Sequence, residues 1–376
     1  MRDVHGRPTV AEVSLSALRA NCGRARELVG PSVAVMAVVK ADAYGHGAAA
    51  AARAFLDAGA AALGVSTVEE AVELRRAGIG GPMVVLGGAF AGEEDAVVAH
   101  DLAAAVSTPA AARALSAAAA RAGRTVALHL KVDTGMTRLG CDAGDLAALG
   151  TAVAALPHVA VAGVFSHFAS ADEVETATAR AQLARFAAAV EALAAAGVRP
   201  PHVHLANSAA VLALPAAHFT MVRPGLMLYG YAPAPHLAAR AALRPAMRFR
   251  TAVALVRRVE AGRAVGYGGT WVAQRPSTIA VLPVGYADGY HRLASNRAQV
   301  ALRGRRVPVA GRVCMDHTML DVTDVPGVAV GDRATLFGDG IGADELGGWC
   351  ETIAYEVLTA VGKRVPRVHV EDFTDG

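Results

Sequence analysis

The chain has 376 residues, of which 54 % are hydrophobic, and a formal net charge of +3 at pH 7. This length is sufficient for two domains that each bury a core, and the absence of a Lys/Arg block argues against a nucleic-acid partner. The polar first ten residues and the arginines that interrupt the alanine-rich stretches argue against a signal peptide and a membrane span. We therefore expect a soluble cytoplasmic protein.

Short apolar runs alternate with helical patterns over the first 225 residues. A helix is predicted within residues 11–29, where apolar residues recur at steps of three and four. The predicted strands that follow cover residues 33–40, 63–67, 83–87, 104–107, 126–133, 161–168, 203–207 and 221–225. Eight strand–helix units predict an α/β fold of the (β/α)8 TIM-barrel type, whose sites lie at the carboxyl ends of its strands. An open doubly wound sheet fits less well, because no glycine-rich fingerprint follows the first strand.

The pattern changes after residue 243 to alternating strands with tight turns. Strands are predicted at residues 251–259, 264–272, 278–284, 299–309, 312–322 and 333–337, and one final helix at residues 355–362. We therefore expect a barrel domain over residues 1–245 and a mainly β C-terminal domain over residues 246–376. The four cysteines lie far apart with no C-x-x-C spacing, so no metal site is predicted.

The first predicted barrel strand ends in an unusual sequence, V-A-V-M-A-V-V-K-A-D-A-Y-G-H-G, over residues 33–47. The valine-rich run is typical of a buried parallel strand, and Lys40 ends it. A lysine in this place either extends to solvent or acts as an amine nucleophile with a lowered pKa. For an isolated lysine the first interpretation is favoured.

Polar residues also end most of the other predicted barrel strands. They are Thr67, Asp133 followed by Arg138, His167, Asn207 with Ser208, and Arg223 with Gly225. Asn207 and Ser208 can simply cap the helix that follows. Barrels nevertheless often hold phosphate at the ends of strands seven and eight, which makes Ser208 and the Gly225 and Leu226 amides candidates. A lysine together with a phosphate cradle is what pyridoxal 5'-phosphate (PLP) requires.

Lys131 lies on the fifth predicted strand, where alternation places it on the same face as His129 and Asp133. It is expected to point into the barrel near Arg138. Two interpretations remain: Asp133 neutralises Lys131 in an internal ion pair, or carbon dioxide carbamylates Lys131 and converts it to an anion that holds Arg138. The residues alone favour the ion pair.

Motifs along nearly the whole chain resemble those of the alanine racemases, a PLP-dependent family. They are A-V-V-K-A-D-A-Y-G-H-G, K-V-D-T-G-M-T-R-L-G, S-H-F-A-S-A-D, H-L-A-N-S-A-A, V-R-P-G-L-M-L-Y-G, V-G-Y-G-G-T-W, V-G-Y-A-D-G and G-R-V-C-M-D. The resemblance implies that Lys40 holds PLP as a Schiff base and is one catalytic base, and that Tyr267 is the other. It also favours carbamylation of Lys131, and it implies a homodimer in which Tyr267 and Met315 serve the partner's site.

The resemblance further implies racemisation of L- and D-alanine through an external aldimine, with D-alanine supplied to peptidoglycan. The implied cofactor-binding residues are Lys40, Tyr44, His167, Asn207, Ser208, Arg223, Gly225, Leu226 and Tyr355. Arg138 and Met315 are implied at the substrate, and Lys131, Tyr286 and Asp316 in supporting roles. Bulky neighbours at the entrance suit a small amino acid.

These residue types suit inversion at Cα, which needs one group on each face of the carbon. Burial beside Arg138 and Arg223 is expected to lower the pKa values of Lys40 and Tyr267. Because an arginine keeps its proton, Arg223 can only donate to a pyridine nitrogen, which we expect to favour reprotonation at Cα over transamination. His167 is expected to orient Tyr267.

Some residues depart from the family pattern, and other functions remain open. Gly266 stands where we expect serine, His317 where we expect glutamine, and the role of Trp271 is not assigned. The alternatives are a racemase of serine or another small amino acid, a PLP-dependent amino acid decarboxylase, and a non-catalytic PLP-binding protein. The decarboxylases typically use a carboxylate where this chain has Arg223, and the non-catalytic proteins lack a β domain.

Overall fold

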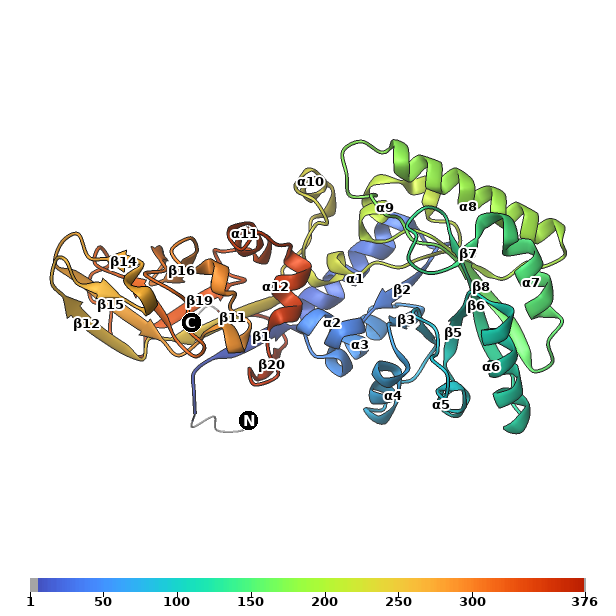
Figure 1. Ribbon diagram of the computed structural model, residues 1–376, viewed down its shortest axis with the longest axis horizontal. Coiled ribbons are helices and arrows are strands. Elements are labelled where there is room, and N and C mark those ends of the chain that lie inside the picture. The colour runs from blue at the N-terminus through green and yellow to red at the C-terminus, as the bar shows by residue number, and fades with distance from the viewer. Residues whose placement is uncertain (1–5, 375–376) are drawn as a thin grey trace. The chain divides into compact units, whose positions relative to one another are not determined.

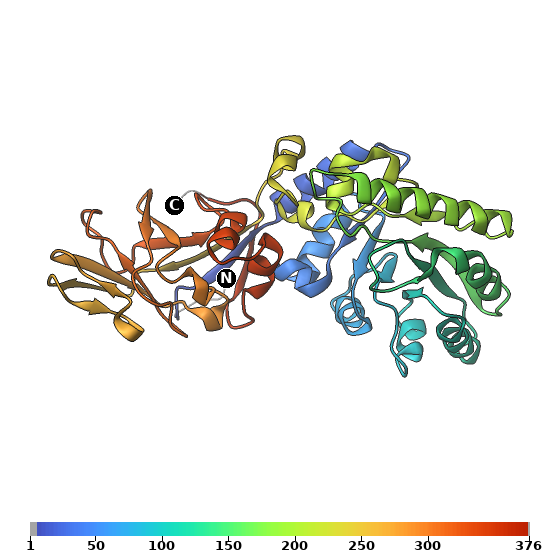
Figure 2. The same cartoon turned by 45° about the horizontal axis from the view of Figure 1, so that its top comes forward.

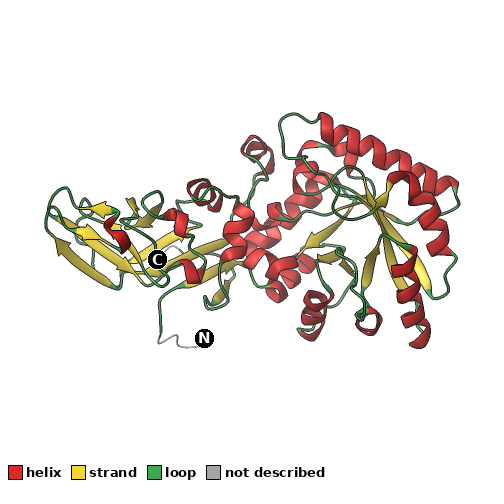
Figure 3. Cartoon of the chain, viewed as in Figure 1, coloured by secondary structure: helices red, strands yellow, loops and turns green. Residues whose placement is uncertain are grey.

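The computed structural model describes residues 6–374, and the chain divides into two compact units. One unit takes in Leu18–Ala43 and Ala48–Arg244. The other takes in the described residues before Leu18, the short stretch Tyr44–Gly47, and the described residues from Pro245 onward. Figure 3 shows that the first unit is rich in helices around a central set of strands, whereas the second is built mainly of strands.

The first unit is a closed barrel of eight parallel strands. In sheet order these are β5 (Ala103–Val106), β4 (Met83–Val85), β3 (Ala62–Val65), β2 (Ala34–Val38), β10 (Met221–Val222), β9 (His202–His204), β8 (Val159–Phe165) and β6 (Val126–Asp133). Pairing of β5 with β6 closes the barrel, and the two-residue β7 (Cys141–Asp142) adds to β6. The predicted TIM barrel is therefore confirmed, and each of the eight predicted strands overlaps an observed one.

Helices cover the outside of the barrel (Figures 1 and 2). They are α1 (Leu15–Val29), α3 (Ala48–Asp57), α4 (Val68–Arg76), α5 (Glu94–Ala99), α6 (Pro109–Arg121), α7 (Leu146–Ala154), α8 (Ala177–Ala195) and α9 (Ser208–Ala213). The short helix α10 (Ala238–Ala241) also belongs to this unit. Local sequence sets several helix starts, such as the capping box of Thr67 with Glu70 and the N-cap Thr108 before a proline. Among residues 6–374, no helix combines the length and apolar character needed to cross a membrane.

The second unit contains three sheets. The largest has the order β17 (Arg305–Pro308), β16 (Gln299–Leu302), β19 (Arg333–Phe337), β11 (Met247–Ala252), β1 (Val10–Ser14) and β20 (Arg367–Val370). A second sheet joins β12 (Leu255–Val259), β15 (Ser277–Leu282) and β18 (Thr318–Asp321), and β13 (Ala264–Val265) pairs with β14 (Trp271–Val272). Two helices, α11 (Ala343–Trp349) and α12 (Ala354–Ala360), complete the unit. The predicted mainly β character of the C-terminal part is confirmed.

Several details differ from the sequence prediction. Three predicted long strands are each two strands, because turns interrupt them; for example, Arg303 and Gly304 adopt the positive φ angles of a tight hairpin between β16 and β17. The strands β1 and β20 and the helix α11 were not predicted. Two consecutive glycines near the end of α11 weaken its helical signal. The strand β1 directly precedes α1 and pairs with β11 and β20, so only long-range pairing reveals it.

The buried carboxylate of Asp288 links three distant segments of the second unit. Asp288 is fully buried and accepts hydrogen bonds from the guanidinium of Arg364, at 2.7 Å, and from the Gly285 amide, at 3.0 Å; Arg7 lies 2.7 Å from it. Burial by itself raises the pKa of Asp288, but these donors outweigh burial and hold the pKa below its ordinary value of 3.8.

We predict that Asp288→Asn lowers the free energy of unfolding by about 1–3 kcal/mol at pH 7, because it removes the buried anion that Arg7 and Arg364 contact, while Arg364 keeps its partly exposed pair with Asp316. Since the folded-state pKa lies below 3.8, this stabilisation is fully present above that pH and is lost as the pH falls through the folded value. Urea unfolding of both proteins at several pH values measures the difference. Asp324→Asn, at an exposed pair with Arg275, is the control and should change stability by less than about 1 kcal/mol. An equal effect of the two substitutions would contradict the prediction.

Candidate functional site

Lys40 begins a short element directly after β2, at the carboxyl end of that strand. The element, α2 (Lys40–Gly45), is a left-handed turn, since the four residues from Ala41 to Tyr44 all have φ near +52°. None of these residues is glycine, so each costs about 1–2 kcal/mol relative to a right-handed turn. Such a conformation persists only where the surroundings impose it.

Glu70 supplies much of that constraint. Its carboxylate accepts the amide of Ala41 at 2.7 Å and, through its other oxygen, the amides of Ser66 at 2.7 Å and Thr67 at 3.3 Å. The same side chain therefore closes the capping box of α4 and fixes the loop that follows Lys40. Asp42 also restrains this loop, because its carboxylate accepts a hydrogen bond from the amide of Ala48 at 2.7 Å.

Arg223 follows β10 and lies buried inside the barrel with no carboxylate partner among residues 6–374. Its Nη1 donates to the ring Nδ1 of His204 at 2.9 Å and to the His204 carbonyl at 2.8 Å. Its Nη2 donates to the Ser166 carbonyl at 2.6 Å and lies 3.3 Å from Nδ1 of His167. Within the described part of the chain, the Nε–H group has no acceptor. Burial lowers the pKa of Arg223, but the guanidinium stays protonated at neutral pH.

An aromatic ring supports the cations of the barrel interior. The guanidinium carbon of Arg223 lies 5.1 Å from the ring centre of Phe165, and the amine of Lys131 lies 4.9 Å from it. The His204 ring stacks on Phe165 with centroids 4.8 Å apart. Phe165 thus packs against both cations and against the imidazole that receives the Arg223 hydrogen bond.

Lys131 points into the barrel, as strand alternation predicted, and its amine donates to the Leu86 carbonyl at 3.3 Å. The alternative of an ion pair with Asp133 is not found, because Asp133 instead accepts the amides of Gly135, Met136 and Thr137. No carboxylate pairs with Lys131 among residues 6–374. Burial, followed by the charges of Arg223, Arg138 and Lys40, lowers the pKa of Lys131 to about 8.

The pKa of Lys40 is also below its ordinary value. The largest cause is burial, and the positive charges of Arg138 and Arg223 act in the same direction, whereas Glu70 opposes them. Lys40, Lys131, Arg138 and Arg223 therefore form a cluster of four cations close enough to affect one another's protonation. We call these four residues the cation cluster.

Ser208 lies at the start of α9 and links it to the segment after β10. Its buried hydroxyl oxygen accepts the amides of Gly225 at 2.9 Å and Met227 at 3.3 Å. Neither the Ser208 hydroxyl proton nor the amide of Leu226 has an acceptor within residues 6–374. Asn207 caps α9 by accepting the Ala210 amide at 3.0 Å, the structural role that its sequence context allowed.

The other candidate residues lie in the second unit. The rings of Tyr44 and Tyr355 are 5.9 Å apart, and burial, together with Tyr355, raises the pKa of Tyr44. Tyr267 follows Gly266, whose φ of +75° and ψ of −175° suit glycine alone, and its side chain is 70 % exposed. Met315 and Tyr286 are exposed as well, and Asp316 pairs with Arg364 at 2.7 Å.

The structure explains two of the three residues that were noted in the sequence as unexpected or unassigned, Trp271 and Gly266. Trp271 packs against the cluster of Val265, Ile279 and Ala310, so it contributes to a local core. A Cβ atom at Gly266 would lie 2.9 Å from Met319, so the glycine suits this turn both in conformation and in space. The His317 side chain is exposed.

Sequence reasoning missed several residues that shape the site, notably Glu70, Phe165 and His204. Glu70 carries a recognisable signal, the T-x-x-E capping box, but its reach to Ala41 depends on the barrel. His204 shares with His202 a period-two pattern on a short strand, which could have placed both histidines on one face.

Comparison with known proteins assigns the family. Family models described as the alanine racemase N-terminal and C-terminal domains match residues 13–233 and 246–369. The chain is 48 % identical to an alanine racemase of Symbiobacterium thermophilum (96 % of this chain, 97 % of the relative) and 45 % identical to one of Desulfovibrio desulfuricans (97 % and 99 %). The crystal structure of alanine racemase from D-cycloserine producing Streptomyces lavendulae superposes with a TM-score of 0.93 at 42 % identity and covers 98 % of both chains. The chain belongs to the alanine racemase family.

Proposed function

We propose that this chain interconverts L-alanine and D-alanine, with PLP attached to Lys40 and with Lys40 and the partner subunit's Tyr267 as the two catalytic bases. The relatives named alanine racemase support the reaction, since they match over nearly the full length of the chain. The observation that carries the choice of residues is the lowered pKa of Lys40 at the end of a buried barrel strand. Cytoplasmic location and use of D-alanine for peptidoglycan belong to the same proposal.

The donors around Lys40 suit PLP, which carries a phosphate, a phenolic oxygen and a pyridine nitrogen. Among residues 6–374, Glu70 is the carboxylate whose charge acts on Lys40, and it is already bonded to three amides. The Ser208 hydroxyl, the Leu226 amide and the Nε–H of Arg223 are donors without acceptors in residues 6–374. An anionic group with several acceptor atoms would complete this set.

Within this proposal, Ser208, Gly225 and Leu226 hold the phosphate, together with Tyr44, Tyr355 and Asn207. Arg223 would donate to the pyridine nitrogen, and Arg138 and Met315 would contact the substrate. When bound, PLP acts as an electron sink that acidifies the Cα–H bond of the amino acid. The protein must then move a proton to and from each face of that carbon.

Lys40 suits one face because burial and two arginines lower its pKa, which makes the neutral amine easier to form. For the other face we propose Tyr267, oriented by His167. Arg223 always donates, so Nδ1 of His167 accepts from it and Nε2 carries the proton that His167 can donate to a phenolic oxygen. Lys131, Tyr286 and Asp316 would support the site from around these groups.

We infer a homodimer because the second unit exposes large side chains that a soluble monomer would normally bury in part. Tyr267 and Met315 are 70 % and 52 % exposed, and Ile353 is 61 % exposed. A second copy that covers this surface would shield them and would bring Tyr267 to a site whose Lys40 belongs to the partner.

Turnover of L-alanine in D2O should give D-alanine with deuterium at Cα, measured by NMR and chiral chromatography. Lys40→Ala should reduce kcat by at least about a thousandfold, because it removes both the attachment point and a base. The chain has three lysines, Lys40, Lys131 and Lys363, so borohydride reduction followed by peptide mapping identifies the attachment site. Lys363→Ala, at an exposed lysine, is the matched control and should leave turnover unchanged. A coloured protein that produces no D-alanine would indicate a non-catalytic PLP-binding protein. Release of carbon dioxide would indicate a decarboxylase, and either result contradicts the proposal.

Mixing two inactive variants tests the shared site. Lys40→Ala and Tyr267→Phe should each lose activity, but their heterodimer contains one site with both native residues. Random exchange of subunits should therefore restore roughly a quarter of the wild-type kcat. If Lys40 and Tyr267 of the same chain formed the site, mixing would restore nothing.

We also propose that Lys131 is carbamylated, because its amine has a pKa of about 8 and lies among cations without an anion partner. The neutral amine attacks carbon dioxide, a C–N bond forms, and the nitrogen loses a proton to leave a carbamate anion. With 13C-bicarbonate, wild-type protein should show a carbamate carbon resonance that Lys131→Ala lacks and Lys363→Ala retains. A spectrum without this resonance, or its persistence in Lys131→Ala, would refute the assignment.

A further inference from the structure

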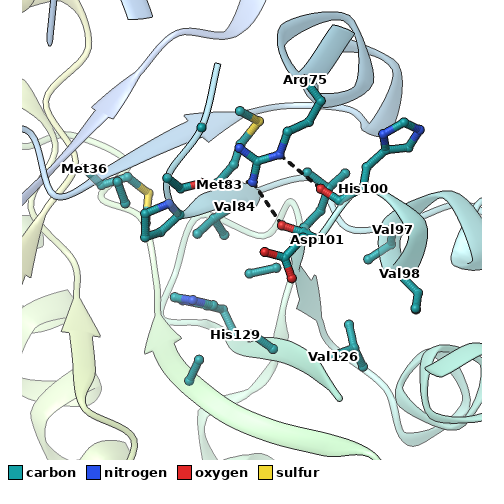
Figure 4. A pocket seen from close by; sticks show the side chains of 18 of the residues that line it. Met36, Arg75, Met83, Val84, Val97, Val98, His100, Asp101, Val126 and His129 are labelled. Atoms are coloured by element: carbon teal, nitrogen blue, oxygen red, sulfur yellow. Dashed lines mark hydrogen bonds between the residues drawn. The ribbon is translucent and has the colours of Figure 1, made fainter. Parts of the chain in front are cut away.

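The barrel contains a cavity of about 840 Å³ at the amino ends of its strands, on the face opposite Lys40 (Figure 4). Loops that lead into β4, β5 and β6 form its rim, and Met36, Met83 and Met221 line it. Barrels usually fill this layer with bulky branched side chains. Here alanines stand at the lining positions Ala62, Ala103, Ala127 and Ala162, which leaves the space open.

The charged groups at the rim already have partners. Arg75 donates to the carbonyl oxygens of Ile79 and Gly81, both at 2.9 Å, and to those of His100 and Asp101, both at 3.0 Å. Arg124 donates to the Val98 carbonyl at 2.8 Å and to the Asp101 carboxylate at 3.1 Å. Carbonyl oxygens do not cancel the charge of Arg75, but this side chain is held at the rim. The lining residues that lie on the barrel strands include no Asp, Glu, Lys or Arg, so the inner part of the cavity suits an uncharged molecule.

The imidazole of His129 contributes a polar ring nitrogen to the wall of the cavity. Its side chain is 3 % exposed, it lines the cavity, and Figure 4 places its ring across from Arg75. Nδ1 of His129 lies 2.9 Å from Nε2 of His204, and Nε2 of His129 has no partner among residues 6–374. Because His129 lines the cavity, a molecule in the cavity can form a hydrogen bond with this nitrogen.

The arginine determines which nitrogen of each ring carries the proton. Because Arg223 can only donate, Nδ1 of His204 accepts, and Nε2 of His204 must carry the hydrogen of the neutral ring. That hydrogen is donated to Nδ1 of His129, so the hydrogen of His129 lies on Nε2. Burial lowers the pKa of His129 to about 3 and that of His204 well below its ordinary value, which keeps both rings neutral.

The barrel makes room for this arrangement at one position. His129 is opposite Gly163 on β8, and a Cβ atom there would lie 2.2 Å from Nδ1 of His129. His202 stacks on the His129 ring at 6.3 Å with an interplanar angle of 6°. The imidazole is therefore held in place by packing as well as by the hydrogen bond to His204.

We propose that this cavity binds an uncharged, mainly apolar molecule that carries one hydrogen-bond acceptor, which accepts the Nε2–H of His129. The volume lies in the range of small-molecule sites, and the barrel-strand residues that line the cavity are apolar apart from His129 and His202. The occupant completes the row of hydrogen bonds that starts at Arg223 and passes through His204. This binding does not rest on the proposed racemase reaction.

Three aromatic probes of similar size test the proposal on the purified full-length protein. Acetophenone has a carbonyl acceptor, ethylbenzene has none, and benzoate is charged. Saturation-transfer NMR should show acetophenone binding about threefold to tenfold more tightly than ethylbenzene, the ratio expected for one net hydrogen bond, and benzoate more weakly than both. Acetophenone should also shift the Nε2 resonance of His129 in 15N-histidine-labelled protein.

Two leucine substitutions on β8 provide a matched pair. Ala162→Leu narrows the cavity and should weaken acetophenone binding at least tenfold, whereas Ala160→Leu, at an exposed position outside the lining, should leave it unchanged. His129→Phe should remove the preference for acetophenone over ethylbenzene. Equal affinity of the two probes for the wild-type protein, no binding up to the solubility limit, or unaltered binding to Ala162→Leu would each overturn the proposal, even if His129→Phe does not fold.

Discussion

The barrel interior is arranged around one buried guanidinium that has no carboxylate partner among the described residues. Arg223 is stabilised by backbone carbonyls, by two imidazoles and by the face of Phe165. A buried charge normally requires a counter-ion, and its removal from water costs several kcal/mol. The neutral acceptors lower that cost without cancelling the charge. The interior therefore remains electropositive. This positive charge adds to the larger effect of burial in lowering the pKa of Lys40 and Lys131, and it suits an anionic ligand.

The same guanidinium imposes a direction on the hydrogen bonds around it. An arginine donates only, so the ring nitrogens of His204 and His167 that face it must accept. Each histidine then presents its proton on the opposite side. The Nε2–H of His167 is available for a hydrogen bond at the mouth of the barrel. The Nε2–H of His204 is donated to His129, whose own Nε2–H faces the cavity at the other end of the barrel. A single side chain thus links the proposed catalytic site with the cavity below it.

The backbone that follows Lys40 adopts an intrinsically unfavourable conformation. Four non-glycine residues in a left-handed turn are unfavourable in isolation, yet they begin three residues after the end of the buried strand β2. Glu70 and Asp42 bind amides on both sides of this turn, and the amide of Ala43 donates to the Val39 carbonyl at 2.9 Å. Rigid scaffolding of a strained loop is typical of functional sites, because the conformation must be ready before the ligand arrives.

The sequence alone determined the barrel, the β-rich C-terminal part and the family, because strand rhythm and motif order are local properties. It also placed Lys40, Arg223 and Ser208 at strand ends. Only the tertiary structure revealed β1 and β20 in the sheet of the second unit, the position of Glu70 beside Ala41, and the contact of Arg223 with His204. It also replaced the possible Lys131–Asp133 ion pair with amide contacts of Asp133. Each of these depends on which distant segments meet, and the hydrophobic pattern that fixes strands and helices does not encode the partners of individual polar atoms.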